Sequence, residues 1–531
     1  YHTDGLINEI ISDFSSQKHI SQDFATNYFY LSGSSIYSTQ NSDIQKVVEN
    51  ECKNKKYVLK SSKNDDYAQA AVVIMDQSNG YVIACSGGLG EKTKSRGFNR
   101  ATQMKRQTGS SMKPVAVLAP AIEKKLVTNV TVFADEPTTF TDYNGEAYSP
   151  IDYDNYKGSI TLRQAVESSQ NIPFVEMMEE ITPKTSMKYL KKMGITTLSE
   201  KDENLALALG GLDKGISPLQ MASAYATIAN DGVYIEPTFY TKIINSNSQI
   251  IIQIKQKKKK IFSKDVAYIV KELLTEPVKG SNGTATYCAI SGMDVAAKTG
   301  TTDENYDRWL CGFTPYYTAV TWYGFDQNET INYNGKKNPA GILWANIMNS
   351  VHSNLASAKF TKTSGVRKIT VCSQTGKIAN TGCPNTYEEY FLAGTKPEVC
   401  DKHSGKEINT NNSSQQNTYN TTNKKTDTVT NSFDTTTTDD LDLPTNTKKD
   451  EKKTNTITNN KNDEMPNNKI ENNNSINSNS NNKQNSINNT TNSNDKQNLI
   501  STNKTNQNTS TSTSEEKKNT KQNVTQKNEN N

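Results

Sequence analysis

Three short motifs in this chain bring together the hydroxyl, amine and amide groups that acyl transfer needs when no histidine serves as base. The first is S-x-x-K, formed by Ser110 and Lys113, whose side chains share one helical face because positions three apart on a helix are neighbours. Burial or nearby cations can depress the pKa of Lys113, so that its amine accepts the Ser110 proton. A serine at a helix start also lies beside free backbone N–H groups. Ser110 is therefore predicted to be an activated nucleophile.

The S-x-x-K pattern alone is weak, because it occurs six times in the chain and four of these copies lie after residue 411. The order of the motifs selects Ser110. Ser169-Gln170-Asn171, an S-x-N motif, begins 59 residues after Ser110, and Lys298-Thr299-Gly300-Thr301 begins 127 residues after Asn171. This is the sole K-[ST]-G sequence, and it directly follows a short apolar strand segment. The conjunction favours a catalytic site over three unrelated helix caps and turns.

Each motif residue has a predicted task. Ser169 can carry a proton to the leaving amine, and Asn171 can hold the substrate amide. Lys298 can steer a carboxylate and depress the pKa of nearby amines.

The segment after Lys298 is predicted to bind substrate and to stabilise the oxyanion. Thr299 and Gly300 are expected to face the substrate, with Gly300 leaving room for a substrate strand at the sheet edge. Thr301 is expected to offer a backbone N–H to the oxyanion, together with that of Ser110.

The elements that must position these motifs are helices alternating with antiparallel strands. The apolar runs 71–75 and 81–85 flank Asn79-Gly80, a hairpin signal. Ser217 is predicted to cap a helix, with Pro218 in its first turn and Gln220 completing a capping box. The remaining predicted elements are a helix from Ser110 to about 125, helices 160–178 and 263–275, strands 295–297 and 318–325, and a solvated lysine turn at 257–260.

Composition excludes several classes of protein. Lys and Arg number 60 against 56 Asp and Glu, so nucleic acid is not an expected partner. The chain has 4 His and lacks H-E-x-x-H, G-x-G-x-x-G and P-loop motifs, which argues against zinc hydrolases, dinucleotide enzymes and NTPases. No cofactor is expected. No apolar stretch approaches about eighteen residues, and the opening at Tyr1 suggests that the sequence begins inside a longer protein.

The order S-x-x-K, S-x-N, K-[ST]-G is the signature of penicillin-binding proteins and serine β-lactamases. Over about residues 1–405 the chain resembles the transpeptidase domain of class A, bifunctional penicillin-binding proteins, with the linker that precedes it. The residues that carry the resemblance are Phe98-Asn99-Arg100-Ala101, Arg106-Gln107-Thr108-Gly109-Ser110-Ser111-Met112-Lys113-Pro114, Ser169-Gln170-Asn171-Ile172-Pro173, Leu207-Ala208-Leu209-Gly210-Gly211, Ser217-Pro218-Leu219, Lys298-Thr299-Gly300-Thr301-Thr302, Asp307, Trp309, Gly312, Thr314 and Pro315.

The resemblance implies a mixed α/β fold of the penicillin-recognising serine hydrolase type, similar to β-lactamases, with an antiparallel sheet flanked by helices. It implies a D,D-transpeptidase acting on pentapeptide stems of lipid-linked precursor and nascent glycan, with β-lactams as covalent inhibitors. It also implies a location at the outer face of a bacterial cell membrane, with a membrane anchor and a glycosyltransferase domain preceding this sequence. The alternatives are a D,D-carboxypeptidase, a serine β-lactamase, for which Glu167 is not suitably spaced as a base, and an inactive wall-binding module.

Four parts are predicted along the chain. Residues 1–64 form a linker or pedestal, 65–360 the transpeptidase domain, 361–405 a small C-terminal extension, and 406–531 a disordered tail rich in Asn, Thr, Ser and Lys. The tail is interpreted as a solvated extension with no specific partner.

The extension contains Cys372, Cys383, Cys400 and His403, which could surround zinc. Their spacing is interpreted as lacking the close pairs of zinc sites, so a disulfide or free thiols are favoured and no metal is expected.

Overall fold

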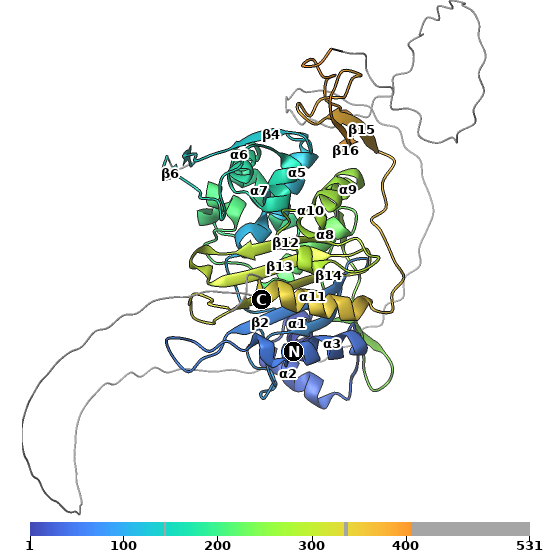
Figure 1. Cartoon of the computed structure of the whole chain (residues 1–531). Coiled ribbons are helices and arrows are strands. Elements are labelled where there is room, and N and C mark those ends of the chain that lie inside the picture. The colour runs from blue at the N-terminus through green and yellow to red at the C-terminus, as the bar shows by residue number, and fades with distance from the viewer. Residues whose placement is uncertain (143–144, 334–337, 405–531) are drawn as a thin grey trace, which may run out of the picture. The chain divides into compact units, whose positions relative to one another are not determined.

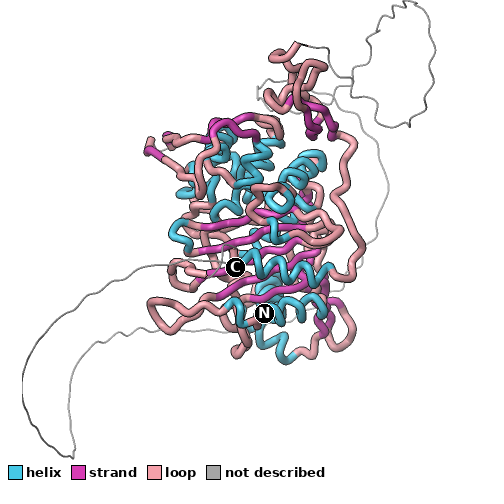
Figure 2. Tube along the Cα trace, viewed as in Figure 1, coloured by secondary structure: helices cyan, strands magenta, loops and turns pink. Residues whose placement is uncertain are grey.

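The computed structural model describes residues 1–142, 145–333 and 338–404 (Figures 1 and 2). The predicted tail, 406–531, lies outside the described residues. All described residues belong to one compact unit of the chain.

The helices and strands follow each other in an α/β order. The helices are α1 (His2–Lys18), α2 (Gln22–Leu31), α3 (Ser42–Cys52), α4 (Ala119–Glu123), α5 (Leu162–Ser168), α6 (Ile172–Ile181), α7 (Pro183–Lys192), α8 (Pro218–Ala229), α9 (Lys264–Leu273), α10 (Glu276–Lys279) and α11 (Pro339–His352). The strands are β1 (Ser35–Ser38), β2 (Gln69–Asp76), β3 (Tyr81–Ser86), β4 (Val132–Asp135), β5 (Phe140–Thr141), β6 (Ala147–Tyr148), β7 (Gly158–Thr161), β8 (Val233–Ile235), β9 (Tyr240–Ile244), β10 (Ile250–Gln253), β11 (Lys258–Lys260), β12 (Ala296–Thr301), β13 (Asp307–Phe313), β14 (Thr318–Gly324), β15 (Val366–Cys372) and β16 (Thr386–Leu392). Short 3-10 or π segments are η1 (Lys55–Tyr57), η2 (Gly109–Met112), η3 (Pro114–Leu118), η4 (Glu200–Asp202), η5 (Leu205–Leu209), η6 (Thr286–Cys288) and η7 (Asp303–Asn305).

A five-stranded sheet forms the centre of the fold, in the order β12-β13-β14-β2-β3. All four strand pairs are antiparallel, so the predicted class, an antiparallel sheet flanked by helices, is confirmed. The β2–β3 hairpin closes at the predicted turn, where Gly80 has a φ of 75°. Strand β12 lies at one edge of this sheet, and on its outer side the Ala297 amide donates to the Leu274 carbonyl at 2.9 Å.

Both faces of the sheet are covered, which explains why β2 is apolar at nearly every position. Val73 and Trp322 pack in one core with α8, whereas Val72 and Leu310 pack in a second core with α11. The alternation follows from the two-residue period of a strand. In Figure 1, α11 crosses in front of the strands and α8 lies behind them. The N-terminal helices join the same cores, α1 the first and α3 the second.

The predicted N-terminal cap of α8 is confirmed. Ser217 and Gln220 form the capping box of α8, with Pro218 in the first turn. A helix was predicted from Ser263, and the structure adds that Ser263 caps α9 by accepting from the Val266 amide. These ends are fixed by neighbouring residues, which is why sequence alone locates them.

The continuous helix predicted over 160–178 is wrong. Residues 158–161 form β7, and the helical part divides into α5 and α6 at Ser169-Gln170-Asn171. Ser169 adopts the left-handed conformation, with a φ of 65°, and ends α5. Pro173 lies in the first turn of α6, where its missing N–H breaks no helical bond.

Two other expectations need correction. Lys258–Lys260 is an exposed strand paired with β8, not a turn. The helix predicted from Ser110 is three short pieces: the 3-10 turn η2, the π segment η3 and α4. Irregular helices of this kind often occur at functional sites.

Within the described ranges, the longest apolar helices fall short of what a membrane crossing requires.

Candidate active site

The turn that carries Ser110 packs directly against the end of β12. Gly109, with a φ of 55°, precedes Ser110, and a Cβ at Gly109 would lie 2.2 Å from the Thr301 carbonyl oxygen. No other residue type fits this contact without moving the turn. The glycine therefore fixes the half-buried Ser110 next to Thr301.

Gly300 has a different role from the predicted one. A Cβ at Gly300 would lie 2.4 Å from the Thr108 carbonyl oxygen and 2.9 Å from Ser111 Oγ. The missing side chain thus makes room for the turn before Ser110, rather than for a substrate strand. The close approach joins the nucleophile turn to the edge strand that carries Lys298.

Lys113 is fully buried and points at the S-x-N motif. Its Nζ donates to Ser169 O at 2.7 Å, Gln170 O at 2.8 Å and Asn171 Oδ1 at 2.6 Å. Burial and, secondarily, the charge of Lys298 lower the pKa of Lys113 well below its usual value. Lys113 thus joins the first two motifs by direct contact.

Lys298 joins the second and third motifs. Its Nζ donates to Ser169 Oγ at 2.7 Å and to Thr299 O at 3.0 Å. Only 1% of the residue is exposed, and this burial lowers its pKa to about 7. Ser169 is held in the left-handed region, which places its hydroxyl beside Lys298 and its carbonyl beside Lys113. Backbone strain of this kind is common at active sites.

Asn171 is anchored by the loop before β7, which sequence reasoning missed. Its amide N–H donates to Asp152 Oδ1, and its Nδ2 donates to Ile151 O at 2.5 Å. Burial raises the pKa of Asp152 to about 6, and its charge raises the pKa of Lys113. No local pattern marks Asp152, because the contact joins residues 19 apart in the chain, with β7 and α5 between them.

A cleft of about 480 Å³ opens onto these residues. Its walls include residues from all three motifs: Ser110, Ser169, Asn171, Thr299 and Thr301. A larger cavity, about 850 Å³, lies beside α1 and contains none of the motif residues. The smaller cleft is therefore the candidate site.

The end of β12 that lines the cleft is held by two side-chain contacts. Thr299 Oγ1 donates to Thr284 Oγ1 at 3.0 Å. Thr301 Oγ1 accepts from Arg308 Nη1 at 2.9 Å. Such fixed geometry is what electrostatic stabilisation of an oxyanion requires.

The cysteines of the extension were expected to form a disulfide or to remain free thiols, and the structure shows free thiols that lie close together. All seven cysteines are free thiols, so no disulfide is present. Cys372, Cys383, Cys400 and His403 nevertheless converge. The sequence does contain a close pair, Cys400-x-x-His403, and this was the missed signal.

A buried serine–lysine site on an antiparallel sheet defines the class of active-site serine enzymes that acylate without histidine. The profile "Penicillin binding protein transpeptidase domain" matches residues 70–349, and "Penicillin-binding protein 1A, C-terminal domain" matches residues 362–405. The chain belongs to the penicillin-binding protein transpeptidase family.

Relatives in sequence agree with this assignment. Penicillin-binding protein 1A of Clostridium tetani is 34% identical over 424 residues, covering 75% of this chain and 53% of that protein. Penicillin-binding protein 1F of Bacillus subtilis is 38% identical over 276 residues, covering 51% of this chain and 37% of that protein. The chain spans about half the length of the first clostridial relatives.

Solved structures agree on the fold. Penicillin-binding protein 1A of Haemophilus influenzae matches with a TM-score of 0.61 and 20% identity, over 73% of this chain and 76% of that one. PonA1 of Mycobacterium tuberculosis, in complex with penicillin V, matches with a TM-score of 0.57 and 25% identity, over 68% of this chain and 96% of that one.

Proposed function

We propose that the chain is a D,D-transpeptidase that crosslinks peptidoglycan stem peptides through an acyl-enzyme on Ser110. The observation that carries the proposal is the convergence of Lys113 and Lys298 on Ser169, at 2.7 Å each, beside the cleft that Ser110 lines. Membership of the transpeptidase family supports it.

Acylation begins when Ser110 Oγ attacks the carbonyl of the penultimate D-alanine. In its neutral form Lys113 has two N–H groups to donate and one lone pair, which takes the hydroxyl proton, and its depressed pKa favours this form. Ser169 passes a proton to the amine of the departing D-alanine and is resupplied through Lys298. The oxyanion is stabilised by the backbone N–H groups of Ser110 and Thr301.

The second half-reaction reverses these roles. An amine of a neighbouring stem peptide attacks the ester, its proton leaves through the same amines, and Ser110 regains its hydrogen. During the preceding acylation, Lys298 and Thr299 hold the terminal carboxylate of the donor, which leaves with the D-alanine, and Asn171 holds the peptide amide of the donor. Gly300 serves by keeping the turn and the strand in contact.

The substrates in this proposal are pentapeptide stems of lipid-linked precursor and nascent glycan, and β-lactams acylate the same serine. The complex of the neighbour PonA1 with penicillin V supports the proposed binding of β-lactams. The enzyme acts at the outer face of a bacterial membrane, within a longer synthase that supplies the anchor and the glycosyltransferase. Residues 65–360 form its catalytic domain, 1–64 connect it, and 361–405 extend it.

Water as acceptor would instead give a D,D-carboxypeptidase or a β-lactamase. The carboxylate of Glu167 accepts from the Asn282 amide at 2.7 Å, and Glu167 is not among the residues that line the cleft. This favours transfer to an amine over activation of water.

The experiment is turnover of a D-Ala-D-Ala stem peptide with a radiolabelled D-amino acid as acceptor. Wild-type protein should give the exchanged peptide in excess of the hydrolysed one, and Ser110→Ala should give neither. Hydrolysis alone would establish a carboxypeptidase, and equal turnover by Ser110→Ala would refute the assignment of Ser110.

A further inference from the structure

Three cysteines and one histidine converge in the small C-terminal extension. Cys372 ends β15, Cys383 lies in the loop that leads to β16, and Cys400 and His403 follow β16. One potential ligand atom from each of the four lies within 4.8 Å of the other three. Segments that are 31 residues apart in the chain thus meet at one point.

The distances suit a tetrahedral ion. His403 Nδ1 lies 3.6 Å from Cys372 Sγ and 3.3 Å from Cys400 Sγ. With Zn–S of about 2.3 Å and Zn–N of about 2.0 Å, tetrahedral ligands are about 3.5 Å apart for S and N, and about 3.8 Å for two S atoms. The four atoms need only small movements to reach this geometry.

The surrounding groups orient the four side chains as they do in zinc sites. His403 Nε2 is 3.2 Å from Gln374 Oε1, so an acceptor holds the ring proton on the nitrogen that faces away from the thiols. Thr375 Oγ1 donates to Cys400 Sγ at 3.4 Å, and the Asn380 amide donates to Cys383 Sγ at 3.4 Å. Donors to sulfur stabilise thiolates, which are the forms that bind metal.

The extension has only a small apolar cluster of its own, although Val366, Tyr390 and Leu392 also pack against the larger core. Its own buried apolar cluster consists of Val371 and Phe391, packed on Val130 of the larger body. Apolar cores this small rarely support a fold without a disulfide or a metal, and the cysteines here form no disulfide.

We propose that Cys372, Cys383, Cys400 and His403 bind one structural Zn²⁺ ion. Three thiolates and an imidazole are a donor set that zinc prefers, and four protein ligands leave no open position for catalysis. Binding releases the protons of the three thiols and changes no oxidation state.

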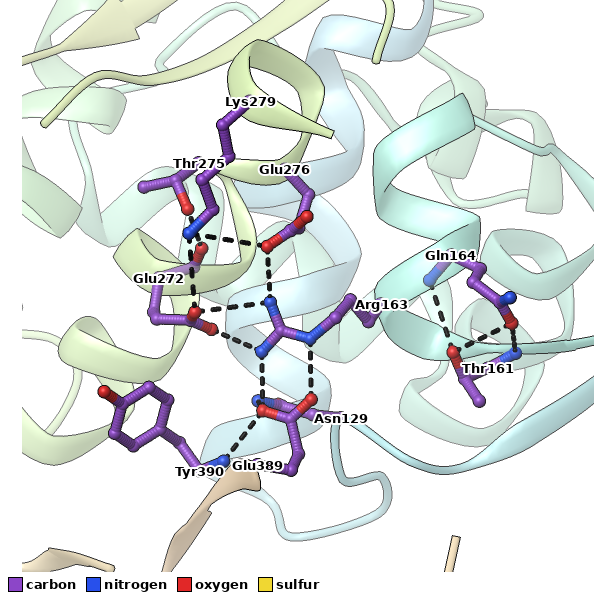
Figure 3. A network of polar contacts seen from close by, with 10 residues as sticks. All are labelled: Asn129, Thr161, Arg163, Gln164, Glu272, Thr275, Glu276, Lys279, Glu389 and Tyr390. Carbon is purple, nitrogen blue, oxygen red and sulfur yellow. Dashed lines mark hydrogen bonds and ion pairs between the residues drawn. The ribbon is translucent and has the colours of Figure 1, made fainter. Parts of the chain in front are cut away.

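The ion would hold the hairpin of β15 and β16. This hairpin contacts the helices beside the active site through the polar network drawn in Figure 3. Glu389 of β16 is 1% exposed and binds Arg163 of α5, whose guanidinium also binds Glu272 of α9 and Glu276 of α10. Asn129 Nδ2 donates to the same Glu389 at 2.8 Å. Because α5 ends at Ser169, the metal site supports a helix that positions the S-x-N motif.

The test measures metal in the full chain, purified under reducing conditions and supplied with Zn²⁺. We expect one zinc per chain by elemental mass spectrometry, loss of zinc in Cys383→Ala, and retention in Cys52→Ala, which removes a buried thiol outside the cluster. After chelation, Co²⁺ alone should give the visible bands of tetrahedral thiolate coordination.

Gln374→Ala keeps all four ligands and guards against misfolding of Cys383→Ala. It should weaken Zn²⁺ binding about tenfold or more, measured by competition with a chromophoric chelator. The proposal is overturned if the wild type stays metal-free and three thiols of its extension can be titrated. It is also overturned if the metal-free wild type has a mass two hydrogens lower than expected, which would indicate a disulfide.

Discussion

Replacing Lys298 with methionine should stabilise the folded protein at neutral pH while abolishing acylation of Ser110. The amine is 1% exposed, and methionine fills nearly the same volume without a charge to desolvate. The variant therefore separates what the lysine does for catalysis from what its burial costs the fold.

The magnitude follows from the pKa. Burial lowers the pKa of Lys298 from 10.5 to about 7, which at about 1.4 kcal/mol per pH unit corresponds to about 5 kcal/mol. Between these two pH values the unfolded chain holds the proton and the folded chain has released it, so the free energy of unfolding rises with pH. From pH 7 to pH 9 this lysine accounts for a rise of about 2 kcal/mol, which Lys298→Met lacks.

The assay is urea unfolding at pH 7, 8 and 9, followed by the fluorescence of the three buried tryptophans, Trp309, Trp322 and Trp344. Lys298→Met should be more stable than wild type at pH 7, and its advantage should shrink by about 2 kcal/mol at pH 9. Lys259→Met, at an exposed lysine, is the control and should show no such trend. An advantage that stays constant with pH would refute the reasoning.

Three further variants test the contacts around the site. Gly300→Ala should slow penicillin acylation about 100-fold, because its Cβ would meet the Thr108 carbonyl at 2.4 Å, while Gly97→Ala has room and should acylate normally in the same assay. Asp152→Asn removes a charge that raises the pKa of Lys113, so the acidic limb of the acylation pH profile should move to lower pH; an unchanged limb would contradict the contact. Glu389→Gln should lower the free energy of unfolding by about 2 kcal/mol in urea titration. Its exposed neighbour Glu388, changed to Gln, should cost at most about 1 kcal/mol, and equal effects would count against the Arg163 network.

Sequence alone identified the parts of the fold that depend on neighbouring residues. The capping box at Ser217 and the Asn79-Gly80 turn are local patterns, and both lie where they were predicted. The strand before Lys298 was also recognised, because a short apolar run directly precedes the motif.

The predictions that failed depend on contacts between residues that are far apart in the chain. The break at Ser169 was hidden because helical periodicity continues through 160–178, and only Lys113 and Lys298 explain the left-handed turn. Asp152 lies in a loop with no periodic signal. Gly300 was assigned to the substrate side because packing of the Ser110 turn on β12 cannot be read from spacing.

The most direct test of the central claim is intact-mass spectrometry of the purified chain after brief exposure to a penicillin, with Ser110→Ala alongside. The account predicts a stable one-to-one adduct on the wild type, mapped by peptide fragmentation to Ser110, and none on the variant. An adduct of equal yield on Ser110→Ala, or a wild type that stays unmodified while the drug remains intact, would contradict it.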